Sequence, residues 1–74
     1  MTWPQVAALD NYLEKAPYDA QAHFVRGYNL RFAGQPTRAL AAFRRVLEIQ
    51  PDHRAAQVFV AALEAKAAGD VTVR

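Results

Sequence analysis

The sequence predicts an all-α fold made of antiparallel helical hairpins, four helices in total. Apolar residues recur at intervals of three and four, and no apolar–polar alternation typical of strands persists. Proline and glycine divide the chain into four helical segments, at Pro4, Pro17, Gly34, Pro36, Pro51 and Gly69. The connections between these segments are short, about two to four residues, and short connections force neighbouring helices to run antiparallel.

The first helix is expected from about Pro4 to Ala16. Thr2 is a favourable N-cap, and Gln5 three residues later completes a capping-box pattern. Pro4 fits a first turn, where its missing N–H has no partner in any case. Pro17 disfavours helical geometry at the residue before it, and therefore ends the helix.

The second helix is expected from about Ala20 to Ala33. Asp19 has a side chain suited to capping its N-terminus. Gly34 suits the left-handed conformation that often follows the last turn of a helix.

The third helix begins at Pro36 and is expected to end at Ile49 or Gln50, before Pro51. The fourth is expected to start after Asp52, as N-cap, and to end near residue 68. Residues 69–74 then form a short tail.

The chain also contains an internal repeat. Pro17 and Pro51 are 34 residues apart, and each follows a helix end and precedes an acidic residue. A 34-residue helix–turn–helix period is that of the tetratricopeptide repeat (TPR). The family's small residue, turn glycine, alanine, aromatic residue and proline have matches in Gly27, Gly34, Ala39, Phe43 and Pro51. The sequence therefore resembles the TPR family.

This resemblance implies a single domain over residues 1–74, built as a fragment of a right-handed solenoid. Residues 3–17 resemble the second helix of a preceding repeat, residues 20–53 a full repeat, and residues 54–68 a capping helix, with residues 69–74 as the tail. The sequence departs from the family pattern at His23, Arg26 and Leu30, and we expect Arg26 to reach Asp10 or Glu14 on the first helix. Another helical-hairpin solenoid and a plain four-helix bundle remain alternatives.

The fourth segment resembles the polar-backed end of a solenoid. A following helix would pack on Gln57 and Glu64, which are both polar. The apolar residues of this segment are expected to face back toward Leu40 and Leu47; they are Phe59, Val60 and Leu63. The N-terminal side is less complete, so either further repeats precede residue 1 or the chain gains burial by self-association.

Composition excludes several classes of site. The chain has no Cys, two His and a net charge of +2, and no nucleophile–base group, zinc pattern or phosphate loop is recognisable. We therefore expect no enzyme activity, cofactor or metal site. No segment approaches the length of about 18 apolar residues that a membrane span needs. The abundance of Ala and Arg suggests a bacterial source, and a cytoplasmic location is favoured if the chain is full length.

The central arginines are a second feature of composition. Residues 26–54 carry six arginines against two acidic residues, and this cluster forms either a solvated face or a contact for an acidic partner. Three of the six, Arg38, Arg44 and Arg45, lie on the third helix. Nucleic-acid binding is not favoured, because no exposed aromatic residue lies among them to stack a base.

The resemblance implies a function in protein–protein interaction. In TPR proteins the first helix of each hairpin lines a concave, partner-binding face. The matching residues here are Gln21, Phe24, Tyr28, Arg31, Phe32, Val58, Ala62 and Lys66, together with Ala55 and Ala65. Three aromatic residues at spacing four, Phe24, Tyr28 and Phe32, form a stripe that is either ordinary core or an exposed apolar patch of the kind that marks partner sites.

We expect the partner to be a protein or peptide with apolar and acidic residues, the acidic ones near Arg31 and Lys66. A homodimer formed through the same stripe is the alternative. The partner's identity and the pathway do not follow from the sequence.

Overall fold

The computed structural model describes residues 3–72, and the side chains of residues 6–67. Within residues 3–72 the chain forms four helices and no strand. They are α1 (Trp3–Lys15), α2 (Ala20–Phe32), α3 (Pro36–Ile49) and α4 (Arg54–Thr72). The predicted all-α class is therefore confirmed.

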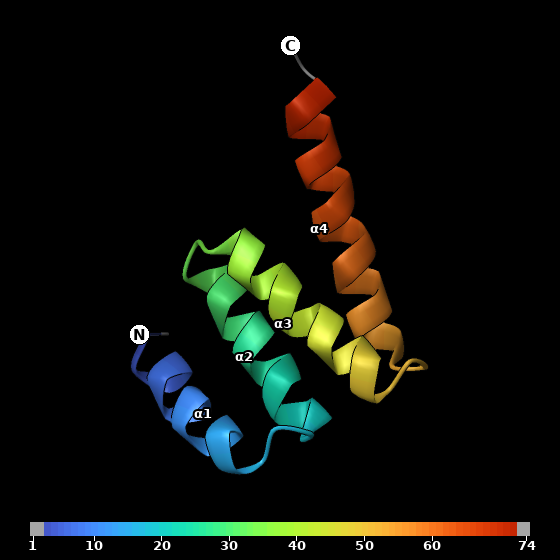
Figure 1. Cartoon of the computed structure of the whole chain (residues 1–74). Helices are drawn as coiled ribbons and strands as arrows, with labels where there is room; N and C mark the ends of the chain where they lie inside the picture. The colour runs from blue at the N-terminus through green and yellow to red at the C-terminus, as the bar shows by residue number, and fades with distance from the viewer. Residues whose placement is uncertain (1–2, 73–74) are drawn as a thin grey trace.

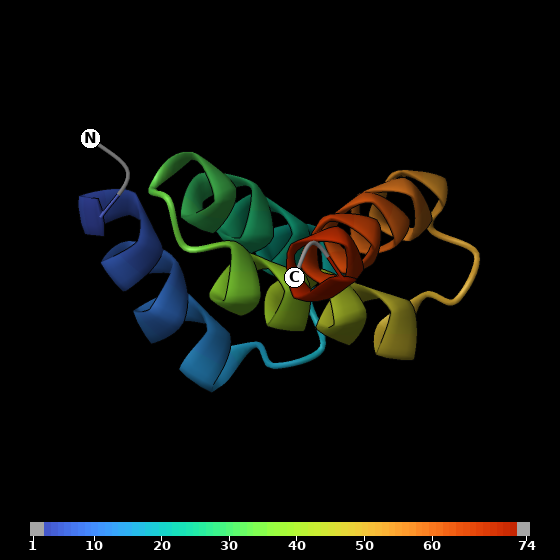
Figure 2. The same cartoon turned by 90° about the horizontal axis from the view of Figure 1, so that it is seen from above.

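The helices form an antiparallel row in which each packs on its neighbour in sequence (Figure 1). The molecule is a flat slab of 42 × 29 × 15 Å. Seen from above, α2 and α4 lie on one side of the slab and α3 lies on the other (Figure 2). The C-terminal half of α4 projects beyond the other helices, so α2 and α4 move apart along their length (Figure 1).

The limits of the first three helices fall within one residue of those predicted. Asp19 caps α2 as expected, because its Oδ1 accepts a hydrogen bond from the amide of Ala22 at 3.0 Å. Gly34 has a φ of +76°, the left-handed conformation that its position after α2 predicts. The predicted cap at Thr2 and the side chain of Gln5 lie outside the part of the chain that is described.

Two predictions about α4 were wrong. Its cap is His53 and not Asp52, because α4 begins at Arg54 and His53 Nδ1 accepts from the amide of Ala56 at 3.1 Å. The helix also continues through Gly69 to Thr72, so residues 69–72 are not a tail. A glycine inside a helix costs only about 1 kcal/mol relative to alanine, which does not compel a helix to end.

The two turns that precede α2 and α4 have the same hydrogen bonds, 34 residues apart. The helix limits repeat at this interval: α1 ends at Lys15 and α3 at Ile49, and α2 begins at Ala20 and α4 at Arg54. The side chains of Asp19 and His53 each accept a hydrogen bond from the backbone amide three residues later, which belongs to Ala22 and Ala56. Three backbone bonds are also repeated: the amides of residues 16, 19 and 23 donate to the carbonyls of 12, 16 and 19, and those of 50, 53 and 57 donate to the carbonyls of 46, 50 and 53. A fourth repeated bond joins the side chain of His23 to the carbonyl of Pro17, and that of Gln57 to the carbonyl of Pro51.

The core consists of two neighbouring clusters. The first joins α1, α2 and α3 through Val6, Leu30, Ala39 and Phe43, and the partly buried residues that pack against it are Phe24, Phe59, Val60 and Leu63. The second contains Ala20, Val46 and Ala56, with Phe24, Leu47 and Ile49 packed against it. Phe59, Val60 and Leu63 thus face inward from α4, as the sequence predicts.

Gly27 allows α2 and α3 to approach closely. A Cβ on Gly27 would lie 2.8 Å from Cε1 of Phe43, closer than carbon atoms pack. The fully buried Phe43 ring therefore takes the space that a side chain at this position would occupy.

Ion pairs join adjacent helices at their edges. Arg26 Nε donates to Asp10 Oδ1 at 2.5 Å, which confirms the predicted contact between α2 and α1. Glu64 accepts from Arg44 of α3 at 2.6 Å, so this face of α4 is partly covered by α3. Arg45 bonds Glu48 at 2.7 Å. Two of the central arginines are thus neutralised within the chain, which favours the solvated-face interpretation.

None of the helices in the described part of the chain is long and apolar enough to cross a membrane.

Candidate protein-binding groove

A groove of about 460 Å³ opens where α4 diverges from the end of α2 and the start of α3. Its wall from the α2–α3 turn includes Arg31, Gly34 and Pro36. The α4 side is formed by Val58, Phe59, Ala62, Leu63 and Lys66. The positive φ of Gly34 reverses the chain at this point, and so brings the end of α2 and the start of α3 to the same wall.

Phe59 connects the floor of the groove to the core. Its ring stacks on the buried ring of Phe43, with centroids 4.9 Å apart and planes inclined by 8°. On α2, Tyr28 meets Phe59 edge-on at 6.3 Å, and the Tyr28 ring meets Phe32 edge-on at 4.8 Å. Aromatic pairs in these geometries add about 0.5–1.5 kcal/mol beyond the area they bury, so these contacts help to hold Phe59 in the apolar floor.

Arg31 is held above this aromatic floor. Its guanidinium carbon lies 5.1 Å from the ring centroid of Phe59 and 5.9 Å from that of Phe32. Cation–π contacts of this kind contribute about 0.5–1 kcal/mol at exposed sites. They orient the cation without neutralising its charge, which stays available to a ligand.

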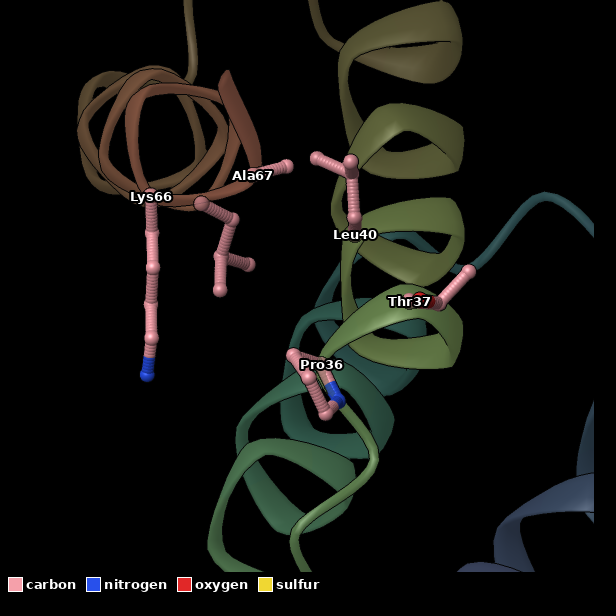
Figure 3. Close-up of a pocket in the computed structure, with 6 residues that line it drawn as sticks. Pro36, Thr37, Leu40, Lys66 and Ala67 are labelled. Atoms are coloured by element: carbon pink, nitrogen blue, oxygen red, sulfur yellow. The ribbon is translucent and has the colours of Figure 1, made fainter. Parts of the chain in front are cut away.

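A smaller pocket of about 140 Å³ adjoins the groove between α3 and α4. The two share Pro36, Leu63 and Lys66. Leu40 of α3 and Ala67 of α4 point toward each other across this gap, and Lys66 extends from α4 beside it (Figure 3). The groove and the pocket therefore form one depression with an apolar lining and a cation at its edge.

The predicted site residues divide into three groups. Arg31, Val58, Ala62 and Lys66 are brought together as walls of the groove. Tyr28 and Phe32 lie beside it and are 42% and 62% exposed. Gln21 is exposed on the first turn of α2 and does not line the groove, and Ala55 and Ala65 are likewise exposed without lining it.

Phe24 is the exception to the predicted exposed stripe. Its ring lies 5.4 Å from Phe43, 5.0 Å from His53 and 5.9 Å from Phe59, and it packs against both core clusters. Phe24 therefore belongs mainly to the core. The reason is its place on α2, because it faces the start of α4, where the two helices are still close.

Sequence reasoning missed the contribution of Phe59, Leu63, Gly34 and Pro36 to the groove. Phe59 and Leu63 were correctly assigned to the inward face of α4, but the divergence of α4 leaves part of each side chain uncovered. Gly34 and Pro36 were recognised as a turn and a helix start. Nothing in the local pattern indicates that the turn faces α4.

The charges of the groove have one sign. Among the residues whose side chains are described, neither Arg31 nor Lys66 forms an ion pair. Both are exposed, so neither carries the desolvation cost that a buried unpaired cation would. The depression thus offers an apolar floor between two accessible positive charges.

Both histidines form hydrogen bonds with the backbone. His23 Nε2 bonds the carbonyl of Pro17 at 2.9 Å, and His53 caps α4. Over the part of the chain that was searched, no group of three or more His, Cys, Asp or Glu side chains is placed to hold a metal ion.

Comparison of the chain with protein-family models, with curated proteins and with solved structures finds no match in any of the three. The resemblance to the tetratricopeptide repeat rests therefore on the residues and on the 34-residue period.

Proposed function

We propose that this chain is a protein-interaction module that binds a peptide segment of another protein in the groove between α2 and α4. The observation that carries the proposal is the single depression that unites Arg31, Val58, Ala62 and Lys66. Its apolar floor and two accessible cations suit a segment with an apolar side chain flanked by acidic residues. Interface centres are enriched in aromatic residues and arginine, and this groove has both.

The architecture that supports the proposal is a fragment of a TPR-like solenoid. The repeated turns at residues 16–23 and 50–57 and the matching helix limits support this assignment. So does the placement of α2 and α4 on the same side of the slab (Figure 2). Repeat proteins use such a side as an extended binding surface.

Selection from phage-displayed random peptides tests the proposed ligand class. We expect enriched sequences that combine a large apolar residue with Asp or Glu. Synthetic versions, measured by fluorescence polarisation, should bind more weakly as salt rises, because exposed charges are screened. No enrichment over a matched selection on the charge-reversed chain described next would refute the proposal.

Charge reversal at the groove, Arg31→Glu with Lys66→Glu, should weaken binding of the selected peptides by more than about tenfold. The matched control reverses two exposed cations that do not line the groove, Lys15→Glu with Arg54→Glu. It changes the net charge by the same amount and should leave binding within about twofold. Equal effects of both double variants would show that only net charge matters.

The aromatic residues beside the groove are tested by Tyr28→Ala with Phe32→Ala. Both side chains are largely exposed, so helical circular dichroism should persist while peptide affinity falls. Loss of the helical signal would assign these residues to the core. If the parent chain is a dimer that this variant makes monomeric, the stripe is a self-association surface instead.

A further inference from the structure

A second, shallow and mostly apolar groove lies between α1 and α2, at the opposite end of the slab (Figure 1). It has a volume of about 350 Å³ and is lined by Ala8, Leu9, Val25 and Asn29. Ala8 and Val25 are exposed. None of its four residues lines the peptide groove.

The internal repeat shows what fits this groove. The counterparts of its lining residues, 34 positions further along the chain, are Ala42, Phe43, Phe59 and Leu63. Residues of α2 pack against the two aromatic counterparts. Phe43 meets Gly27 and Phe24, and Phe59 meets Phe24 and Tyr28. Leu63 packs against the cluster that contains Leu30, and Ala42 is buried.

The counterpart of α2 is α4, because Ala20 and Arg54 begin the two helices at the same point of the repeat. The face of α2 that covers these residues corresponds to an exposed, small and apolar face of α4: Val58, Ala61 and Ala62 stand where α2 has Phe24, Gly27 and Tyr28. Ala61 is small at the position where Gly27 lets α3 approach. Glu64 stands where α2 has the buried Leu30, and it bonds Arg44 of α3. The part of the α4 surface that can receive a helix like α1 is therefore the apolar set of Val58, Ala61 and Ala62.

We propose that a second copy of this chain occupies the groove, with α4 of one copy packed between α1 and α2 of the next. In this head-to-tail contact, α1 of the second copy lies against α4 as α3 lies against α2 within one chain. Leu9 of the second copy takes the place of Phe43 and packs over Ala61. This contact does not use the aromatic stripe and does not rest on peptide binding, but it shares Val58 and Ala62 with the peptide groove, so a bound peptide and a second copy would compete for α4.

Charge favours a second copy arranged in this direction. The polar edge of α1 carries Asp10 and Glu14, with Lys15 at its end. The edge that α1 would join belongs to α3, which carries Arg38, Arg44 and Arg45 against Glu48. Arg44 and Arg45 already pair with Glu64 and Glu48, and Asp10 pairs with Arg26, so the contribution of charge is the remaining difference in formal charge, −1 for α1 and +2 for α3. A head-to-tail contact brings the acidic helix beside the basic one, whereas a symmetric contact through the α1–α2 groove would place acidic residues on both sides. Opposite charges across an interface select partner and orientation.

A head-to-tail contact leaves one binding surface of each kind free at the two ends of the assembly. Each added copy presents a free groove at one end and a free α4 at the other, so assembly continues unless the rotation closes a ring. Light scattering should therefore give a mass that rises with concentration past twice 8.2 kDa. A mass that stays at 8.2 kDa up to about 1 mM would overturn the proposal.

Three matched alanine-to-arginine substitutions at exposed helical sites locate the contact. Ala8→Arg blocks the groove, Ala61→Arg blocks the α4 face, and both should give monomers. Ala7→Arg is the control, because its counterpart Ala41 stays exposed within the chain, and it should assemble as the parent does. All three sites are exposed and arginine is a good helix former, so circular dichroism should show the same helicity in each.

Mixing the two blocked variants decides the direction of the contact. Ala8→Arg keeps a free α4 and Ala61→Arg keeps a free groove, so an equimolar mixture should form a one-to-one complex of about twice 8.2 kDa that grows no further. A symmetric interface predicts instead that one variant dimerises alone. Either that result, or assembly of both variants like the parent, would overturn the proposal.

Cross-linking gives a second measurement if a substitution perturbs the fold. The chain has no cysteine, so Leu9→Cys and Ala61→Cys introduce unique thiols at the proposed contact. Oxidation of the mixed variants should give the cross-linked pair faster than oxidation of either variant alone. Equal rates in all three samples would contradict the proposed packing of residue 9 on residue 61.

Discussion

The close approach at Gly27 makes a counter-intuitive prediction about Gly27→Ala. Alanine is the better helix former, and in a helix interior it gains about 1 kcal/mol over glycine. The new methyl group, however, would lie 2.8 Å from Cε1 of Phe43 and 3.0 Å from Cδ1 and Cζ. Ordinary carbon–carbon contacts are about 3.5–4.0 Å, so the ring must move by several tenths of an ångström or more.

The ring of Phe43 has little room to move. It is fully buried, stacks on Phe59 at 4.9 Å and meets Phe24 at 5.4 Å. Overpacking of a core costs about 1–3 kcal/mol, which exceeds the gain in helix propensity. We therefore expect a net loss of about 1 kcal/mol, equivalent to a Tm lower by about 4–8 °C for a domain of this size.

Urea unfolding followed by circular dichroism measures this loss, at a concentration low enough to suppress association. The repeat supplies a control, because Ala61 is the counterpart of Gly27 on α4 and is exposed. Ala61→Gly should cost about 1 kcal/mol from propensity alone. If Gly27→Ala instead raises the stability by a similar amount, the inferred clash with Phe43 is absent.

A double-mutant cycle identifies Phe43 as the cause. Phe43→Leu alone should destabilise the chain by leaving a cavity, but it should also relieve the crowding caused by Gly27→Ala. The two substitutions together should therefore cost less than the sum of their separate effects, by about 1 kcal/mol. Additive effects would place the strain elsewhere.

Two further predictions concern the turns. Gly34→Ala should lower the free energy of unfolding by about 1 kcal/mol, because a side chain is disfavoured at a φ of +76°; Gly34→Asn should cost less, and equal unfolding midpoints for the three chains would contradict this account. The pKa of Asp19 lies below its usual value because the hydroxyl of Tyr12 donates to it at 2.6 Å and the amide of Ala22 also donates. The ionised Asp19 carboxylate therefore adds its full contribution to the free energy of unfolding above the usual aspartate pKa of about 4. This contribution declines as the pH falls below that value and is gone below the depressed pKa of the folded state. Asp19→Asn retains a capping oxygen without this titration, so the difference in stability between the parent and the variant should shrink with acidification; parallel pH profiles would exclude the contribution.

The number of helices and the limits of the first three were predictable because Pro17, Gly34, Pro36 and Pro51 act locally. Proline restricts the residue before it, and glycine permits the left-handed turn. The cap of α4 was mispredicted because Asp52 is the better capping residue by type. The 34-residue period already pointed to His53, the counterpart of Asp19, and the repeated hydrogen bonds show that position in the repeat decides which side chain caps.

The groove was only partly predictable because helix spacing says which residues share a face and not how far a neighbouring helix covers it. Phe24, Tyr28 and Phe32 share one face of α2, yet their exposure rises from half-buried to 42% and then 62% along the helix. This gradient follows the divergence of α4 (Figure 1). The angle between two helices depends on packing between residues distant in sequence, which a local pattern does not contain.

The groove and the core share their central ring. Phe59 forms part of the groove floor with one portion of its surface and stacks on Phe43 with another. Phe43 in turn fills the space left open by the missing side chain of Gly27. The glycine therefore sets how deeply Phe43 enters the α2–α3 hairpin, and Phe43 sets where Phe59 and the start of α4 are held. The depth of the proposed binding groove thus depends on a position that neither lines it nor carries a side chain, which explains why a small residue there serves the site as well as the fold.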